Sequence, residues 1–170
     1  MTLSCKTGAF NTIMDELAIN TVLDELRKMD LSMKNVFLLF GPVDILVQLH
    51  FKDLDEFINK WFNPIRAITP EEPMIEKTQT LIVISEGKPY TEEPYAFLFL
   101  NTQPRNIEQV QQDLQSIPNV LSADTVFGPY DLICAVKANN KEDLKRLVLK
   151  IQRDVSNIQG TVTAIVASIY

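Results

Sequence analysis

The sequence contains few of the side chains on which catalytic and metal sites usually depend. Among its 170 residues there are two cysteines and one histidine. Cys5 and Cys134 have no metal-like spacing and lie in apolar, strand-like surroundings, so we interpret both as reduced and structural. His50 has no evident carboxylate or thiol partner, which makes it a poor catalyst or metal ligand. We therefore expect neither a metal ion nor a cofactor.

The sequence also lacks the features of membrane proteins and of nucleic-acid binders. No stretch approaches the roughly 18 apolar residues of a membrane span, and no basic segment precedes an apolar run at the start. We therefore expect a cytoplasmic protein without a membrane partner. The formal net charge is −6, from 16 basic and 22 acidic residues. Nucleic-acid recognition needs a clustered basic face, whereas the basic residues here are interspersed with acids, so we expect no direct nucleic acid binding.

The sequence does contain an internal repeat. The segment Gly41-Pro42-Val43-Asp44-Ile45-Leu46 returns 87 residues later as Gly128-Pro129-Tyr130-Asp131-Leu132-Ile133, each time between two short apolar runs. Near the end of each half, Thr78-Gln79-Thr80 corresponds to Thr161-Val162-Thr163. The repeat predicts two similar structural units. A half of about 85 residues has a thinly stabilised core, so we expect the halves to bury surface on each other.

The second half predicts the order strand, helix, strand, strand, helix, strand. The predicted strands are 95–100, 120–127, 132–136 and 162–169; the first helix is closed by Ile117-Pro118-Asn119, and the second is capped by Asn139 or Asn140. With right-handed crossovers this order gives a four-stranded antiparallel sheet with both helices on one face, the ferredoxin-like arrangement. The strands do not alternate apolar with polar residues. The bare face therefore needs a cover, for which the sheet of the first half is the obvious candidate.

The first half predicts a looser copy of this order. Its predicted elements are a strand at 3–6, a helix at 15–29, hairpin strands at 36–40 and 44–49, a helix at 54–62 stopped by Pro64, a polar loop at 70–73 and a strand at 78–84. The segment 86–94 is the predicted linker. We therefore expect an α+β fold of two ferredoxin-like βαββαβ repeats, at 1–87 and 88–170, packed sheet to sheet.

Several segments of the second half together resemble a known family. They are Ala96-Phe97-Leu98-Phe99-Leu100-Asn101-Thr102, Ile117-Pro118-Asn119-Val120, the hairpin 126–132 and the strand 161–166. Over nearly all of 95–169 they resemble the effector-binding (RAM) domain of the Lrp/AsnC regulators. The first half resembles this family only through Gly41-Pro-x-Asp44 and Thr78-x-Thr80, and it has Val43 where the family has tyrosine.

The resemblance implies a dimeric α/β barrel in which two such domains pair sheet to sheet. Here a single chain would supply both domains in tandem, as an intrachain barrel. The resemblance also implies that the family's N-terminal helix-turn-helix domain is missing and that the first repeat, 1–87, fills its place. The first repeat is then a degenerate copy, and 88–170 is the RAM-like domain.

The resemblance further implies a site for a small effector, commonly an amino acid, at the hairpin loop and the edge of the last strand. The candidate residues of the second copy are Gly128, Tyr130, Asp131, Thr161 and Thr163. A Gly-Pro turn leaves backbone open to a zwitterion, an aspartate can pair with an ammonium group, and a tyrosine ring can close over an aliphatic side chain.

A structural interpretation of the same residues stays open. Glycine, proline and aspartate are ordinary turn residues, and threonine is a good strand former. In the first copy, Gly41 and Asp44 are the corresponding ligand-binding candidates, and the loss of the tyrosine at Val43 indicates a decayed site.

Three functions are compatible with these features. The favoured one is a stand-alone regulatory module that binds a small-molecule effector, by resemblance an amino acid, and acts through assembly or through a DNA-binding regulator partner. We expect homo-oligomers of intrachain pseudo-dimers, with the effector site where two of them meet. The second is a structural or interaction subunit with decayed pockets. The third is an enzyme, since dimeric α/β barrels also host monooxygenases and haem enzymes. No phosphate loop, nucleophile elbow or zinc spacing supports catalysis, so we expect no enzyme.

Overall fold

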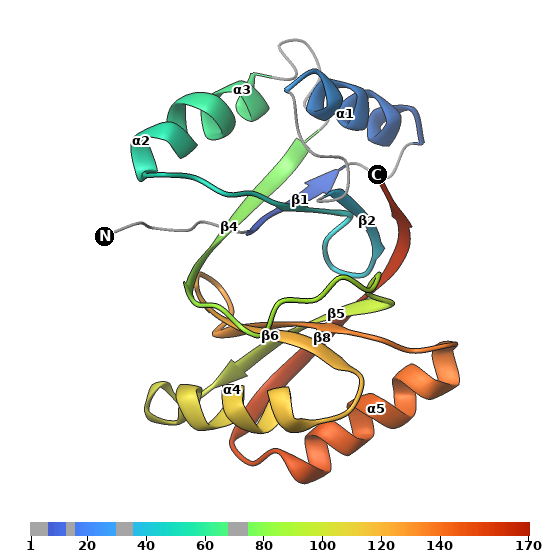
Figure 1. Cartoon of the computed structure of the whole chain (residues 1–170). Helices are drawn as coiled ribbons and strands as arrows, with labels where there is room; N and C mark the ends of the chain where they lie inside the picture. The colour runs from blue at the N-terminus through green and yellow to red at the C-terminus, as the bar shows by residue number, and fades with distance from the viewer. Residues whose placement is uncertain (1–6, 13–15, 30–35, 68–74) are drawn as a thin grey trace. The chain divides into compact units, whose positions relative to one another are not determined.

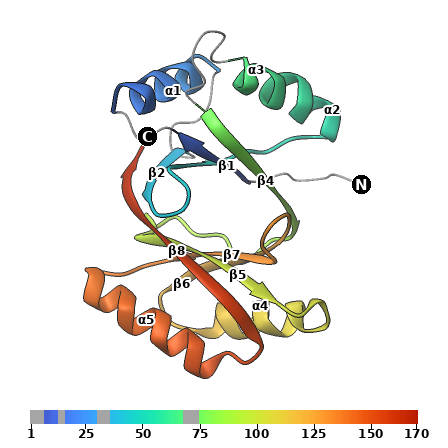
Figure 2. The ribbon, with the colours of Figure 1, turned by 180° about the vertical axis from the view of Figure 1, so that it is seen from behind.

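The computed structural model describes residues 7–12, 16–29, 36–67 and 75–170. These residues divide into two compact units. Unit 1 comprises the described residues up to Ile82 together with Ala167–Tyr170, and unit 2 comprises Val83–Val166. Both units mix helices with antiparallel strands, and Figures 1 and 2 show their elements from opposite sides.

Unit 2 follows the order strand, helix, strand, strand, helix, strand. Its elements are β5 Ala96–Thr102, a 3-10 turn Pro104–Asn106, α4 Ile107–Ser116, β6 Val120–Phe127, β7 Leu132–Val136, α5 Lys141–Asp154 and β8 Ile158–Ile169. The strands pair antiparallel in the order β8–β5–β7–β6, and α4 and α5 lie on one face of this sheet (Figure 1). The predicted boundaries of β6 and β7 are confirmed. The linker before β5 has no regular secondary structure.

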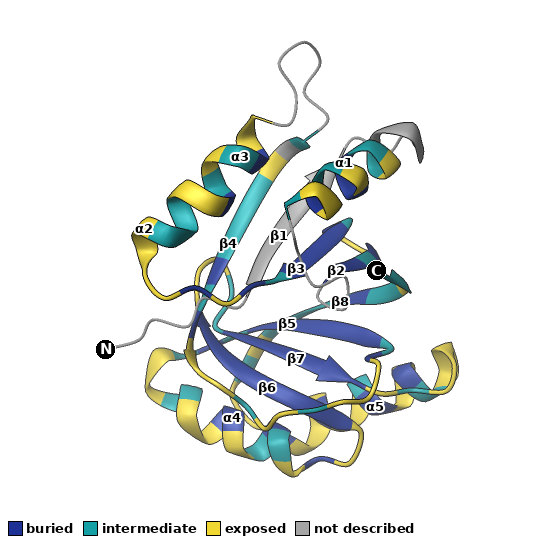
Figure 3. Ribbon diagram, turned by 45° about the horizontal axis from the view of Figure 1, so that its top comes forward, coloured by how far each residue is buried: buried dark blue, intermediate teal, exposed yellow. Residues whose placement is uncertain are grey.

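The sheet of unit 2 is buried on both faces. Leu98 and Leu100 pack with Val110 and Leu114 of α4 and with Leu147 and Ile151 of α5 in one core cluster. The alternate residues Phe97 and Phe99 point to the other face, where each is only 1% exposed. Figure 3 shows β5, β6 and β7 as almost entirely buried. The lack of polar alternation in the sequence is therefore explained by burial on two sides.

Unit 1 has the same order of strands and helices. Its elements are β1 Thr7–Thr12, α1 Glu16–Lys28, β2 Val36–Phe40, β3 Ile45–Gln48, α2 Leu54–Phe57, a π-helical turn Ile58–Phe62, α3 Asn63–Arg66 and β4 Ile75–Ser85. The strand order is β4–β1–β3–β2, again antiparallel. The predicted strand at 3–6 and the predicted loop at 70–73 lie outside the described residues. The first described strand is β1, which begins at Thr7, directly after the predicted range.

The two sheets share their register as well as their order. Val36 pairs with Val47 in unit 1, and Ala123 pairs with Cys134 in unit 2, both 87 residues further on. The first strand of each unit has a bulge at the same place, between Asn11 and Thr12 in β1 and at 101–102 in β5. Residues that lie 87 apart in the sequence therefore occupy equivalent paired positions in the two sheets.

The second helical segment of unit 1 corrects the prediction that Pro64 stops it. The helix continues through the π-helical turn into α3, where Pro64 lies in the first turn. The Asn63 N–H donates to Ile58 O, five residues back, and the Ala67 N–H donates to Asn63 O, four residues back. Pro64 sits where the hydrogen-bond pattern changes, and a proline is tolerated in a first helical turn because its missing N–H is not needed there.

Both helices of unit 2 are followed by an asparagine with left-handed backbone. Asn119 (φ 72°) lies three residues after α4, and Asn157 (φ 71°) lies three residues after α5. Asparagine tolerates this conformation better than most residues do. The chain turns at Asn157 directly into β8, which begins at Ile158, four residues before the predicted 162. Asn140, one of the two predicted caps, is the N-cap of α5 and accepts a hydrogen bond from the Asp143 N–H.

The last strand of each half ends in the other unit. Ala167–Tyr170, the end of β8, belongs to unit 1, where the Tyr170 N–H donates to Val36 O at 2.9 Å. The Arg27 guanidinium lies 5.7 Å from the centre of the Tyr170 ring. Val83–Ser85, the end of β4, belongs to unit 2. Unit 1 is therefore made from two separate stretches of sequence, whereas unit 2 is one continuous stretch.

A buried polar network fixes the residues that follow β4. The Gly87 N–H donates to Asp124 Oδ1 at 2.6 Å, and Ser122 Oγ donates to the same oxygen at 3.2 Å. Gln111 Nε2 donates to Ser85 O and to Ala123 O. These bonds join the start of the linker to β6 and α4. Among the described residues, no helix is both long and apolar enough to cross a membrane.

Candidate functional site

The β6–β7 hairpin turn carries three of the predicted site residues. The Val126 N–H closes the turn by donating to Asp131 O at 2.9 Å. Gly128 is exposed, and Tyr130 and Asp131 are half-buried. Gly128 does not have positive φ, so the turn does not require glycine for its backbone conformation. What glycine provides here is an exposed backbone without a side chain.

The Asp131 carboxylate is held in place by the end of β5. Its Oδ2 accepts a hydrogen bond from the Thr102 N–H at 2.8 Å, while the Asp131 N–H donates to Leu100 O at 2.9 Å. Asn101 Nδ2 donates to Pro129 O at 3.3 Å, which adds a further tie between strand and turn. The second carboxylate oxygen, Oδ1, accepts no hydrogen bond from residues of unit 2. Asp131 therefore has a structural role through one oxygen, Oδ2.

The Tyr130 ring packs on the sheet face away from the helices. Its centre lies 5.1 Å from the centre of the Phe99 ring, with 38° between the ring planes. Phe99 alternates with Leu98 and Leu100, which face α4 and α5. The contact fixes the tyrosine beside Asp131 and gives the turn an apolar wall.

The two predicted threonines of β8 lie on the other face. Thr161 pairs with Leu100 and Thr163 pairs with Leu98, and directly opposed residues of antiparallel strands share a face. The threonine side chains therefore lie on the helix-covered side, away from Tyr130. Thr161 Oγ1 is buried and has no hydrogen-bond partner among the described residues. The backbone of β8 reaches the hairpin end of β5, since Gly160 pairs with Asn101.

The first hairpin has the same closing bond and a different side chain in its turn. The Leu39 N–H donates to Asp44 O at 2.7 Å, as Val126 does to Asp131. Gly41 is exposed and Asp44 is half-buried. Val43, which stands in place of Tyr130, is buried at 2% exposure. This turn therefore gives an apolar side chain to the core where the second turn has an aromatic ring with a hydroxyl.

Cys134, in the middle of β7, is a free thiol buried in the core of unit 2. Burial raises the pKa of the thiol far above its usual range, with a smaller contribution from the Asp124 charge. An inert, protonated thiol fits the predicted structural role. Cys5 lies outside the described residues.

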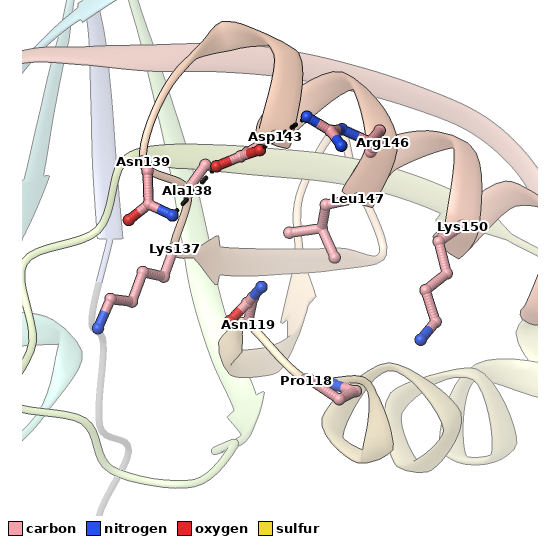
Figure 4. Close-up of a pocket in the computed structure, with 9 residues that line it drawn as sticks. All are labelled: Pro118, Asn119, Lys137, Ala138, Asn139, Asp143, Arg146, Leu147 and Lys150. Carbon is pink, nitrogen blue, oxygen red and sulfur yellow. Dashed lines mark hydrogen bonds and ion pairs between the residues drawn. The ribbon is translucent and has the colours of Figure 1, made fainter.

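A cavity missed by the sequence analysis lies at the opposite end of the β6–β7 hairpin. Its volume is about 380 Å³, and its lining includes Asn119, Lys137, Arg146 and Lys150 (Figure 4). The i, i+4 spacing of Arg146 and Lys150 was the available signal, since it puts both on one side of a helix. Their meeting with the turn at Asn119 depends on tertiary structure.

Comparisons with known proteins find a family match in the second half of the chain. Residues 95–170 match the family model described as the Lrp/AsnC ligand binding domain. Over 77 residues the chain is 27% identical to an uncharacterized HTH-type transcriptional regulator of Pyrococcus abyssi, a match that covers 45% of this chain and 49% of the relative. The chain therefore spans about half the length of this curated relative.

Two solved structures are also similar. A hypothetical protein from Pyrococcus horikoshii is 31% identical with a TM-score of 0.40, and the match covers 44% of this chain and 89% of that chain. The siroheme decarboxylase NirDL, in complex with an iron-uroporphyrin III analogue, has a TM-score of 0.68 at 10% identity, covering 96% of this chain and 71% of that chain. At this identity the second likeness is one of fold alone.

Proposed function

Residues 95–170 match the Lrp/AsnC ligand binding domain, and on this premise we propose that the chain is a regulatory module that binds a small-molecule effector at the β6–β7 hairpin. The observation that carries the proposal is the half-buried Asp131 carboxylate, held by the Thr102 N–H through one oxygen. Its orientation is fixed before a ligand arrives, which lowers the entropic cost of binding. The naming of the Pyrococcus abyssi relative as a transcriptional regulator supports a regulatory role.

An amino acid is the effector that best matches the groups at this turn. The Asp131 carboxylate can pair with an α-ammonium group. The exposed backbone around Gly128 can meet the polar groups of a zwitterion, and the Tyr130 ring offers an apolar surface to an aliphatic side chain. We keep Thr161 and Thr163 as supporting residues on β8, with their hydroxyls on the helix side of the sheet. Gly41 and Asp44 belong to a weaker, first-copy site in this proposal.

The proposal includes an architecture for signalling. The sheets of the two units face one another as an intrachain dimeric α/β barrel, and such chains assemble as homo-oligomers with the effector between them. Burial of β5 on both faces, with helices on one, supports this packing. The signal would pass in the cytoplasm to a DNA-binding regulator partner, because the net charge of −6 disfavours direct contact with DNA. The module binds and does not catalyse.

The test of effector binding is a thermal-denaturation screen of the whole chain against the twenty amino acids. A ligand at ~100 times its dissociation constant adds about 2.7 kcal/mol to the free energy of unfolding, which raises the Tm of a protein of this size by roughly 5–10 °C. A shift confined to one amino acid or a few related ones supports the proposal. No shift with any amino acid in large excess would favour the structural subunit with decayed pockets.

Two substitutions of Asp131 separate its charge from its structural bond. Asp131→Asn keeps an oxygen that can accept the Thr102 N–H and removes the charge. We expect near-native stability and at least roughly tenfold weaker effector binding, because hydrogen bonds to charged groups contribute about 1.5–3 kcal/mol. Asp131→Ala removes both and should also lower stability by about 1 kcal/mol. Native effector affinity in Asp131→Asn would show that the carboxylate is only structural.

A further inference from the structure

The cavity at the far end of the β6–β7 hairpin is separate from the Asp131 turn. It opens between the turn at Pro118-Asn119, the residues that follow β7, and the N-terminal part of α5. Figure 4 shows the side chain of Leu147 on α5 pointing toward Asn119. The eight residues of β6 separate this cavity from the turn by roughly 25 Å, at about 3.3 Å per residue. A ligand at one site does not touch the other.

The lining of the cavity is basic in an otherwise acidic protein. Lys137, Arg146 and Lys150 face a single acid, Asp143, whereas the whole chain has 22 acidic and 16 basic residues. Asp143 is already neutralised: its Oδ1 accepts from Arg146 Nη2 at 3.2 Å, and its Oδ2 accepts from Asn139 Nδ2 at 3.0 Å (Figure 4). The cavity therefore carries a surplus of positive charge.

Three hydrogen-bond donors at the cavity remain available. The Lys150 ammonium has no carboxylate within ion-pair distance in unit 2, and the Asn119 side-chain amide makes no hydrogen bond there. The Arg146 guanidinium uses one nitrogen on Asp143 and keeps its other N–H groups. Lys137 lies at the rim, where its charge is matched by an ion pair with Glu92. An ammonium, a guanidinium and an amide are the donors that proteins use for phosphate and carboxylate groups.

The backbone fixes the positions of the residues that carry these donors. Asn119 O accepts the Lys137 N–H at 2.8 Å, which joins the turn before β6 to the end of β7. Arg146 and Lys150 project from one side of α5, which is anchored in the core by Leu147 and Ile151. Leu147 and Ala138 give the cavity an apolar part. A ligand with a charged end and a carbon skeleton could therefore contact both the donors and the apolar part.

We propose that this cavity binds the oxyanionic group, phosphate or carboxylate, of a small ligand. Lys150, Arg146 and Asn119 donate to the oxyanion, and Leu147 and Ala138 contact the rest of the molecule. The volume of about 380 Å³ falls within the range of roughly 300–1,000 Å³ typical of ligand pockets. This site does not rest on the effector site at Asp131.

The test is an NMR titration of the whole chain with sodium phosphate, with sodium acetate, and with sodium chloride as a control. Exposed charges are screened within about 10 Å at 0.1 M salt, so the titrations use a lower, matched ionic strength. We expect saturable shifts of the Asn119, Leu147 and Lys150 amides with phosphate, acetate or both, and none with chloride. Phosphate alone identifies a phosphate site, and binding of acetate extends it to carboxylates. Equal shifts with all three salts, or none, would overturn the proposal.

Three variants make the titration specific to the cavity. Lys150→Gln should weaken oxyanion binding by about tenfold, as expected for one lost charged hydrogen bond. Lys145→Gln, an exposed change of equal charge on α5 outside the cavity, should leave binding unchanged. Ala138→Phe fills the space and keeps every donor, so it should abolish binding in a protein with a native spectrum. Equal weakening by Lys145→Gln, or native binding in Ala138→Phe, would contradict the site. Asp131→Asn should have no effect.

Discussion

Unit 1 and unit 2 have the same sheet and different surroundings. Strand order and the register near the hairpin turns agree, with Val47 at the place of Cys134, both completely buried. Two of the positions that differ open or fill space. In the turn, Val43 of unit 1 is equivalent to Tyr130 of unit 2. After the third strand, Phe51 of unit 1 is equivalent to Ala138 of unit 2. The comparison teaches that the backbone of this fold is specified by its buried strands, while a few side chains at the sheet ends decide whether the space beside them is open or filled.

The helices show the same difference. Phe57 and Leu144 are core residues 87 apart, whereas Trp61 and Leu147, the next core positions, are 86 apart. One extra residue in unit 1 is accommodated by the π-helical turn, which is how such turns absorb insertions. With this shift Pro64 takes the place of Lys150. The aromatic contact of Phe51 with Trp61, at 6.0 Å between ring centres, fills unit 1 where unit 2 has its cavity.

The largest expected effect comes from placing a charge at the shared buried position. Cys134→Asp should lower the free energy of unfolding by several kcal/mol, because an unpaired carboxylate would be buried. Urea unfolding followed by the fluorescence of Trp61, the single tryptophan, reports on unit 1. If the sheets face each other as proposed, the midpoint of the Trp61 transition moves to a lower urea concentration, although the substitution is in unit 2. Cys134→Val, the residue of unit 1, should cost far less. An unmoved Trp61 transition beside a lost unit 2 would mean that the units fold independently.

A second comparison concerns two glycines of unit 2. A Cβ on Gly87 would lie 2.5 Å from Ala123 O and 2.6 Å from Ala123 N, and would also collide with Ser122 Oγ. We expect Gly87→Ala to cost about 1–3 kcal/mol, as overpacking does. A Cβ on Gly160 would meet only Asn101 Oδ1, at 3.9 Å. Gly160→Ala should therefore stay close to native in a urea melt, and equal losses for both variants would refute the close-packing argument.

The two turns offer a third, functional comparison. Asp131→Asn should weaken effector binding by at least roughly tenfold, as argued above, while Asp44→Asn should change it little because Val43 has replaced the tyrosine. Isothermal titration of both variants with the amino acid found in the screen measures the difference. Equal losses would mean that both turns bind effector and that the first copy has not decayed.

The smallest expected effect is a pH dependence in unit 1. The hydrogen bond from Lys60, followed by the one from the Lys52 N–H, lowers the pKa of the Glu56 carboxyl below 4.5. The contribution of this carboxylate to stability is therefore present above pH 4.5 and is lost as the pH falls through the lowered folded-state pKa. Glu56→Gln should lower the urea midpoint slightly at pH 7 and not at strongly acidic pH. Glu93→Gln, an exposed change in the linker, should show no such pH dependence.

Much of the strand pattern was predictable because strands buried on both faces consist of continuous apolar runs between turn residues. The runs before and after Gly128-Pro129 gave β6 and β7 their correct ends. The first strand was harder: Thr7–Thr12 contains glycine, alanine and asparagine, which are poor strand formers, and its stability comes from pairing with β3 and β4. The start of β8 was missed because Asn157-Ile158-Gln159-Gly160 resembles a loop, although the turn ends at Asn157.

The site was predictable only in part. The Gly-Pro-Tyr-Asp segment identified the turn, but the bond from Thr102 N–H to Asp131 joins residues 29 apart in sequence. No local pattern contains that bond, and none contains the register that turns the β8 threonines toward the helices. The basic cavity combines a turn, a strand end and a helix side, so its parts are visible in the sequence and their convergence is not.

The exchange of strand ends has a consequence for how the protein is made. Unit 1 includes Ala167–Tyr170, and the Tyr170 N–H bond to Val36 O belongs to its sheet. The half of the chain that leaves the ribosome first is therefore not complete until the last of these residues is synthesised. At ~5–20 residues per second, the stretch from 83 to 170 takes roughly 4–18 s. During this interval β2 pairs with β3 alone and lacks its partner in Ala167–Tyr170, so an emerging chain is open to pairing with the end of another copy.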